Sequence, residues 1–215
     1  MEKKTSSGQK IQFTLPDGSK VWQNAETSLK YPAQFDFFQR EIFLEGEIFI
    51  DVKHQQGKPF TIHTQRAQIR VLGTSLNIKS YAETGSMETV VLEGQVQVVQ
   101  ETNDQNPLLL SANERAVLTN SSSQFIKEVV DAREYIGWKE GTLRFENESL
   151  AEILRTLERW YGVDIEVTSE SLYHCRFTGR FHKKTLSEIL NQMSIALNIH
   201  YTITQKVVTL SGPGC

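Results

Sequence analysis

The C-terminal third of the sequence contains one short pattern twice, 36 residues apart, and this repeat restricts the fold more than any other feature. In each copy a hydroxyl residue is followed three positions later by glutamate, which is the capping box that satisfies free amides at a helix start. We therefore expect one helix to begin at Ser149 and another at Thr185. The copies read Arg144-Phe145, three residues, Ser149-Leu150-Ala151-Glu152-Ile153-Leu154, and Arg180-Phe181, three residues, Thr185-Leu186-Ser187-Glu188-Ile189-Leu190.

Apolar residues follow both caps with the spacing of a helix that buries one stripe. They are Leu150, Ile153, Leu154, Leu157 and Tyr161 in the first copy and Leu186, Ile189, Leu190, Met193 and Leu197 in the second. Alternating apolar residues after each helix, and a last strand at Val207 to Leu210, complete a repeated strand-helix-strand unit. Residues 136–211 are thus predicted to form a small α+β domain in which two helices cover one face of a sheet, followed by a tail over 212–215.

Residues 10–135 are predicted to form an all-β domain, because about a dozen short strand patterns follow one another without a helical period. An antiparallel sandwich, a roll and a β-solenoid all agree with this pattern. Residues 1–9 are polar, and we expect them to be a flexible lead-in outside the fold.

Composition excludes several classes of protein. The chain has 215 residues, 39% of them hydrophobic, and a net charge of −3, so it has the content of a globular protein and no basic excess for binding nucleic acid. No stretch approaches the roughly 18 apolar residues of a membrane span, and we expect a soluble chain. Cys175 and Cys215 form neither a metal-spaced cluster nor a convincing disulfide framework, which leaves the redox compartment open.

The motifs of common enzymes are absent from the sequence. The five histidines lack the spacing of a metal site, and no phosphate-binding loop, serine elbow or Cys-x-x-Cys pair is present. We therefore expect no enzyme activity, metal or cofactor. Glu45, Glu47 and Asp51 lie near one strand pair, where a solvated hairpin face is a better interpretation than an acid/base couple. With Phe37-Phe38, they are the support for an alternative function as a carbohydrate-binding or glycan-processing β-domain.

Two further features each have a chemical and a structural interpretation. The hydroxyl of Thr74 directly follows the carbonyl of Gly73, so it can attack that carbonyl and convert the amide into an ester where the backbone is strained. The structural interpretation of this pair is a glycine bulge between two strands. Arg144 and Arg180 recur at equivalent positions, either to grip carboxylates of a partner or as solvated strand residues.

Six motifs follow one another over most of residues 10 to 129: Leu15 to Ala25, Leu29 to Pro32, Leu44 to Glu47, Pro59 to Thr64, Val71 to Ile78 and Leu92 to Gly94. With these motifs the N-terminal domain resembles the periplasmic domain of the FecR family of anti-sigma regulators. The repeated C-terminal unit resembles the domain that follows in Bacteroidetes-type FecR proteins, which is similar to the short N-terminal domain of secretins and TonB-dependent transducers. Gln23 and Leu76 depart from the family pattern, and the family's cytoplasmic sigma-binding segment and membrane helix are missing.

This resemblance implies the periplasmic, signal-receiving part of a regulator anchored in the inner membrane. Such a regulator is not an enzyme; it relays the state of an outer-membrane TonB-dependent receptor to an extracytoplasmic-function (ECF) sigma factor, which it contacts through a segment outside this sequence. Some family members cleave themselves at a Gly-Thr bond, and Gly73-Thr74 matches these residue types. For the receptor we expect a docking site at an unpaired sheet edge formed by Val207, Val208, Thr209 and Leu210. A third interpretation is a structural assembly domain, because secretin-like units also build rings.

Overall fold

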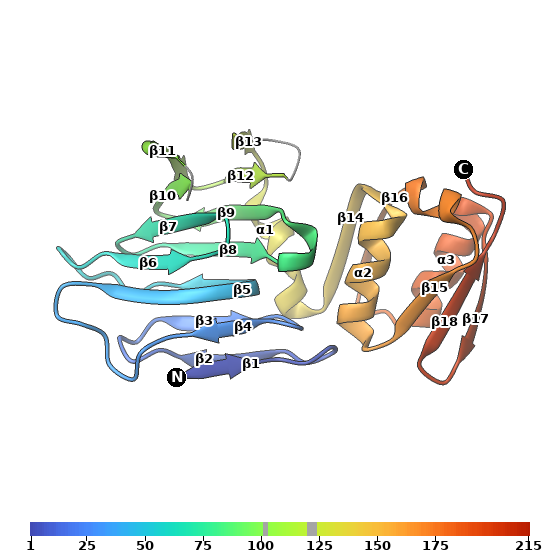
Figure 1. Cartoon of the computed structure of the whole chain (residues 1–215), viewed down its shortest axis with the longest axis horizontal. Helices are drawn as coiled ribbons and strands as arrows, with labels where there is room; N and C mark the ends of the chain where they lie inside the picture. Colours follow the sequence, from blue (N-terminus) through green and yellow to red (C-terminus); the bar gives the residue numbers. More distant parts are fainter. Residues whose placement is uncertain (101–102, 120–123) are drawn as a thin grey trace. The chain divides into compact units, whose positions relative to one another are not determined.

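The computed structural model describes residues 1–100, 103–119 and 124–215 (Figure 1). The chain divides into two compact units: the first contains Met1–Thr5 and Lys10–Ile136, and the second contains Ser6–Gln9 and Gly137–Cys215. The first unit is all-β apart from the short helices η1 (Ala82–Thr84) and α1 (Ala132–Tyr135), and the second is α+β. No helix among the described residues is long and apolar enough to cross a membrane.

The expectation of a flexible lead-in over residues 1–9 is wrong. Residues Glu2–Lys4 form strand β1, which pairs antiparallel with β4 (Ser28–Lys30). Thr5 is buried, and its hydroxyl donates to the carbonyl oxygen of Asn24 at 2.5 Å. Further along, the amide of Gly8 donates to the carbonyl oxygen of Arg159 at 2.7 Å within the second unit. Backbone hydrogen bonds, rather than buried apolar side chains, hold this polar segment in place. Its sequence therefore has no apolar pattern that predicts its structure.

The strands of the first unit form one thirteen-stranded sheet among the described residues, and its two halves share strand β5 (Arg40–Asp51). One half contains β1, β4, the first part of β5, β6 (Phe60–His63), β7 (Ala67–Val71), β10 (Gln95–Gln100) and β11 (Asn103–Ser111). The other half contains β2 (Ile11–Thr14), β3 (Lys20–Gln23), the second part of β5, β8 (Ser75–Ser80), β9 (Met87–Glu93), β12 (Glu114–Leu118) and β13 (Ile126–Val129).

The long strand β5 changes its partners at Gly46. Before this residue it pairs with β4 and, in parallel, with β6; from this residue on it pairs with β8 and β3. The sheet therefore folds over on itself, and both halves contribute to one core. Core residues on one half include Ile42, Phe60, Ile69 and Val98, and those on the other half include Ile48, Ile50, Leu76, Ile78 and Val91. The predicted all-β domain is confirmed, and its architecture is that of a curled, two-layered sheet.

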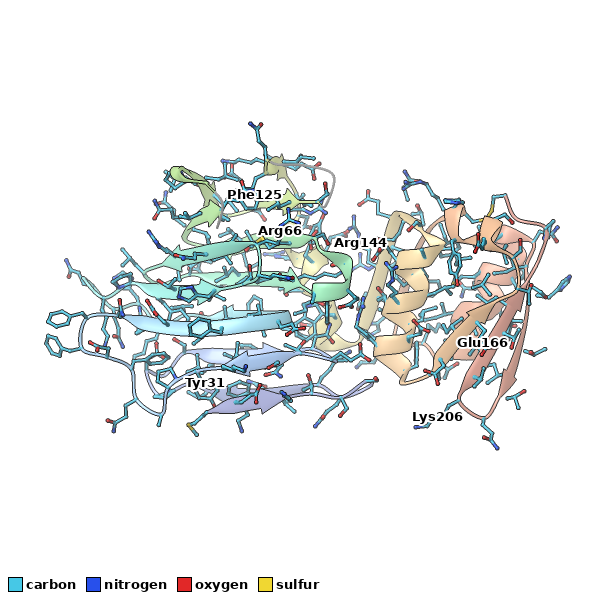
Figure 2. The ribbon with its side chains drawn as sticks, in the orientation of Figure 1. Tyr31, Arg66, Phe125, Arg144, Glu166 and Lys206 are labelled. Carbon is cyan, nitrogen blue, oxygen red and sulfur yellow. A yellow bond between two sulfur atoms is a disulfide. The ribbon has the colours of Figure 1, made fainter. Side chains whose placement is uncertain are left out.

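Arg66, Tyr31 and Phe125 make three different kinds of contact within this unit (Figure 2). Arg66, between β6 and β7, donates to the carbonyl oxygens of Gly85 at 2.7 Å and Thr119 at 3.4 Å. Tyr31 is buried and stacks on the ring of Phe13, with 5.9 Å between ring centroids. Phe125 packs against the same core.

The second unit contains the predicted repeat. Its elements are η2 (Gly137–Glu140), β14 (Thr142–Ser149), α2 (Leu150–Tyr161), β15 (Asp164–Val167), η3 (Glu170–His174), β16 (Arg176–His182), α3 (Leu186–Leu197), β17 (His200–Thr204) and β18 (Val207–Ser211). Both helices begin where the capping boxes predict, with the hydroxyls of Ser149 and Thr185 accepting from the amides of Glu152 and Glu188.

The pairing of the strands differs from the single sheet that we expected. The first strands of the two copies, β14 and β16, pair with each other, whereas β15, β18 and β17 form a separate sheet in that order. Helix α2 contacts β14 and β15, and α3 contacts β16 and β17, so the helices lie between the two sheets (Figure 1). Helical and strand periodicity show which residues are buried, but not which strands become neighbours.

Candidate functional site

An ion pair buried in the first unit organises the turns around the Gly73-Thr74 bond. Asp17 lies in the turn between β2 and β3, where its carboxylate accepts from the amide of Ser19 at 3.0 Å and from the hydroxyl of Ser19 at 2.8 Å. Arg40 begins β5 with a side chain that is 0% exposed, and it donates to Asp17 Oδ2 at 2.8 Å. A buried guanidinium requires such an acceptor, since a lone buried charge is very costly.

The guanidinium of Arg40 also binds three backbone carbonyls from two different loops. It donates to the oxygens of Lys53 and Lys58 at 2.8 Å each, and to that of Leu72 at 3.3 Å. Its plane lies over the ring of Phe60, with 5.2 Å to the centroid. One buried side chain thus fixes the loop after β5 against the turn between β7 and β8.

The Gly73-Thr74 bond lies in that turn, on a surface groove of about 720 Å³. Thr74 is 4% exposed, and its Oγ1 donates to the carbonyl oxygen of Gln95 at 2.8 Å. The carbonyl of Thr74 accepts from the amide of Val52 at 3.0 Å. The pairing of β8 with β9 shifts register directly afterwards: Ser75 pairs with Glu93 and Leu76 with Val91, so the extra residue lies on β9 and not at Gly73. The bond thus lies in the turn before β8, and the hydroxyl of Thr74 is held by its hydrogen bond to Gln95.

The three carboxylates that suggested a glycan site do not form an exposed acid/base couple. Glu47 is 9% exposed, and its two oxygens accept from the side-chain amides of Asn24 at 2.7 Å and Asn77 at 3.0 Å. Glu45 is exposed, and Asp51 accepts from a serine hydroxyl on β8. Glu47 is therefore a buried structural carboxylate, which strand alternation did not reveal. Burial also lowers the pKa of Lys10 to about 8, against the opposing attraction of Glu47.

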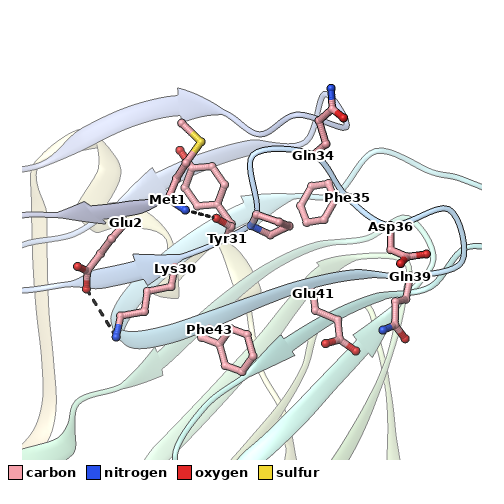
Figure 3. A pocket seen from close by; sticks show the side chains of 11 residues that line it. Met1, Glu2, Lys30, Tyr31, Gln34, Phe35, Asp36, Gln39, Glu41 and Phe43 are labelled. Carbon is pink, nitrogen blue, oxygen red and sulfur yellow. Dashed lines mark hydrogen bonds and ion pairs between the residues drawn. The ribbon is translucent and has the colours of Figure 1, made fainter.

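An aromatic groove of about 1040 Å³ lies beside the N-terminal part of β5 (Figure 3). Phe35 packs edge-on against Phe60, and Phe43, which is 53% exposed, stacks on the ring of His63 at 4.7 Å. Phe37 and Phe38 are 83% and 76% exposed and contact each other. The two phenylalanines thus lie at the surface, whereas Tyr31 packs in the core.

The expectation of a free edge at Val207, Val208, Thr209 and Leu210 is wrong. These residues belong to β18, which pairs in parallel with β15 and antiparallel with β17, so it is the central strand of its sheet. Val208 and Leu210 are buried in the core of the unit. Being last in sequence does not make a strand the edge of a sheet, because a return connection can insert it between earlier strands.

The two repeated arginines lie directly opposite each other on β14 and β16, at the register Arg144↔Arg180. Arg144 also forms an ion pair of 2.5 Å with Glu146, whose side chain is 65% exposed. The structure therefore brings the arginines together on one face of the small sheet, away from the buried Leu143 and Phe145 of the same strand.

The two cysteines form a disulfide, contrary to the expectation from their number and spacing. Cys175 and Cys215 are 40 residues apart in sequence, and their Cα atoms lie 5.4 Å apart. The bond ties the expected C-terminal tail to the end of η3, where Cys175 is buried. Among the described residues no group of three or more histidine, cysteine or acidic side chains has the arrangement of a metal site.

Comparisons with known proteins agree for both units. A family profile for FecR protein matches residues 2–97, and a profile for the FecR C-terminal region matches residues 142–210. Two crystal structures of a candidate anti-sigma factor from Parabacteroides distasonis, at 1.65 Å and 2.50 Å resolution, resemble the chain with a TM-score of 0.92 and 30% sequence identity. The alignments cover 100% of this chain and 100% and 99% of the crystal chains. No curated protein sequence matches.

Proposed function

The chain belongs to the FecR family of anti-sigma regulators, and we propose that it is the periplasmic, signal-receiving part of a regulator anchored in the inner membrane. In this role it relays the state of an outer-membrane TonB-dependent receptor to an ECF sigma factor, which the regulator contacts through a cytoplasmic segment. The observation that carries the proposal is the agreement of both units, over the whole chain, with a relative assigned to the anti-sigma class.

The disulfide supports the proposed periplasmic location of the chain. Bonds such as that between Cys175 and Cys215 persist in oxidising environments, including the bacterial periplasm, and are rare in the cytosol, where thiols are kept reduced. The bond closes a long loop around β16, α3 and both strands that follow. A domain that depends on this closure is suited to the periplasm.

The docking element that we propose is the free edge of β17. This strand pairs only with β18 among the described strands, and it ends its sheet (Figure 1). Natural edge strands are usually protected by charges, proline or bulges. The opposite edge, β15, carries Asp164 and Glu166, whereas β17 reads His-Tyr-Thr-Ile-Thr and has no acidic or lysine residue. An extended receptor segment can therefore add to β17 with backbone hydrogen bonds.

The test is capture of this chain by periplasmic signalling domains of TonB-dependent receptors from the same genome. The edge variant is Thr202→Lys with Thr204→Lys, because both threonines are exposed and lysines protect edge strands. The matched control is Glu166→Lys on the opposite edge, which changes the net charge by the same amount. We expect one receptor domain to bind the wild type and the control but not the edge variant.

Other outcomes separate the parts of the proposal. Loss of binding in both variants assigns the effect to charge and contradicts docking at β17. Binding of no receptor domain to the folded wild type contradicts the receptor relay itself. Binding of polysaccharides, measured by calorimetry, would instead favour the glycan-binding alternative that Phe37 and Phe38 suggested.

We also propose that the chain cleaves itself between Gly73 and Thr74. The observation that favours this second activity is the side chain of Thr74, which is buried and whose hydroxyl is oriented by a hydrogen bond to the carbonyl oxygen of Gln95. Intact-mass measurement under denaturing conditions tests it. Wild type should yield fragments ending at 73 and beginning at 74, and Thr74→Ala should stay at 24.5 kDa. A wild-type chain that stays whole after prolonged incubation contradicts the activity.

A further inference from the structure

The side chain of His54 lies directly against Gly73. A Cβ atom built on Gly73 would be 2.5 Å from Cβ, 2.7 Å from Cα and 2.7 Å from Nδ1 of His54. Atoms from both the backbone and the ring of His54 thus occupy the space that any larger residue at position 73 would need. The remainder of the histidine is exposed to the groove that also contains Gly73 and Thr74.

A second glycine, Gly94, packs against the Gly73-Thr74 bond from another side. A Cβ atom on Gly94 would be 2.8 Å from Oγ1 of Thr74 and 3.0 Å from the carbonyl oxygen of Gly73. The φ angle of Gly94 is +91°, in the region that favours glycine. The backbone of Gly94 therefore lies against the attacking oxygen and the carbonyl oxygen, while His54 lies against the α-carbon.

The contacts of Arg40 explain why these groups meet. It binds the carbonyl of Lys53, the residue before His54, and the carbonyl of Leu72, the residue before Gly73. The same fully buried guanidinium therefore sets the position of both segments.

Cleavage of the Gly73-Thr74 bond also requires a group that accepts the proton of the Thr74 hydroxyl. The carbonyl oxygen of Gln95 orients the hydroxyl of Thr74 but cannot take its proton. Among the described residues that line the groove, the polar side chains besides Thr74 are His54, Arg70, Gln95 and Gln97. Arginine stays protonated and glutamine amides do not titrate, whereas imidazole both accepts and donates a proton near neutral pH. His54 is the one lining side chain suited to this role.

We propose that His54 is the general acid-base group for cleavage at Gly73-Thr74, an inference that rests on the self-cleavage proposed above. Oγ1 of Thr74 bonds to the carbonyl carbon of Gly73, and the carbon-nitrogen bond breaks. The imidazole takes the hydroxyl proton and delivers it to the nitrogen of Thr74, which leaves as an amine. Water then hydrolyses the ester, giving a carboxylate at Gly73 and the free hydroxyl of Thr74. No oxidant or reductant is needed.

The experiment follows cleavage of the purified full chain from pH 5 to pH 9 by intact mass, with hydroxylamine to trap the ester. We expect His54→Gln to slow cleavage by about 10²- to 10⁴-fold, the usual contribution of general acid-base catalysis, and to flatten the pH profile. His200→Gln, at an exposed histidine of the second unit, is the matched control and should cleave like wild type. Added imidazole should restore cleavage to His54→Ala, because the vacated space opens to the groove.

The outcomes separate this inference from the activity on which it rests. If wild type stays whole at every pH, self-cleavage fails and the role of His54 fails with it. If wild type cleaves and His54→Gln matches its rate and pH profile, only the role of His54 is overturned. A slower His54→Gln chain with an unchanged pH profile and no imidazole rescue shows a purely structural residue, and it overturns the inference as well.

Discussion

Replacing Arg40 with methionine should destabilise the first unit by about 3–5 kcal/mol, the usual cost of removing one partner from a buried ion pair. Methionine keeps most of the apolar stem over Phe60 but removes four hydrogen bonds, one to Asp17 and three to backbone carbonyls. At about 1.5 kcal/mol for each bond to a charged group, the low end of the usual range, the four bonds together give about 6 kcal/mol. Removing the guanidinium from water costs free energy in the wild type, and this cost offsets part of the sum. The expected loss is therefore about 3–5 kcal/mol.

Urea unfolding of the full chain, combined with amide hydrogen exchange, measures this loss. Peptides from β3, β5 and β8 report on the first unit, so the exchange data assign the transition to it. The matched control is Arg70→Met on β7, because Arg70 is exposed and its guanidinium donates to the side chain of the neighbouring Gln68. We expect the control to change stability by no more than about 0.5 kcal/mol.

The double variant Arg40→Met with Asp17→Asn separates the cost of the lost hydrogen bonds from the cost of leaving a buried carboxylate without its cation. It removes the carboxylate that the single variant leaves buried and unpaired, so it should be more stable than Arg40→Met alone. A loss below about 1 kcal/mol in the single variant, the value of a surface ion pair, would refute the reasoning. That result would mean that water reaches Asp17 and the three carbonyls.

Three further predictions concern titration and the disulfide. Because burial lowers the pKa of Lys10 to about 8, the folded chain binds fewer protons than the unfolded chain between that pH and about 10.4, so the free energy of unfolding should rise with pH there. Lys10→Met should remove this rise in urea titrations, and an unchanged slope contradicts the assignment. Hydrogen bonds from Lys184 and Thr185 lower the pKa of Glu188 to about 2, so its stabilisation of α3 is present above about pH 4.3 and lost as the pH falls towards 2. The stability difference from Glu188→Gln should vanish over that window, and a difference that persists at pH 2 would count against it. Cys215→Ser should cost roughly 4 kcal/mol in the second unit in the chain-entropy model for a loop of this length, measured by calorimetry, and reduction of the wild type should match it.

Local patterns in the sequence predicted the local structure of the second unit. The hydroxyls of Ser149 and Thr185 cap the starts of α2 and α3, with the full capping box at α3, and the apolar stripes lie on the faces that the helices bury. These signals depend on residues within four positions of one another, so a single sequence is enough to detect them. The alternation over residues 10–135 likewise predicted an all-β unit, although it left three architectures open.

The same patterns were silent on which segments meet. Four expectations failed for this reason: the single sheet of the second unit, the free edge at Val207 to Leu210, the unstructured start of the chain, and the absence of a disulfide. Each of them depends on pairing between residues far apart in sequence.

The sequence by itself determined the kinds of elements in this protein, the two helix starts and the Gly-Thr bond as a candidate site. Only the tertiary structure decided that β18 is a central strand, that Glu47 is buried, and that His54 lies against Gly73. The physical reason is the range of the interactions. Caps and periodicity act within a turn or two of the backbone, whereas the buried guanidinium of Arg40 joins a turn, a loop and a hairpin from separate parts of the chain. The residues next to Arg40 in the sequence give no indication of these partners.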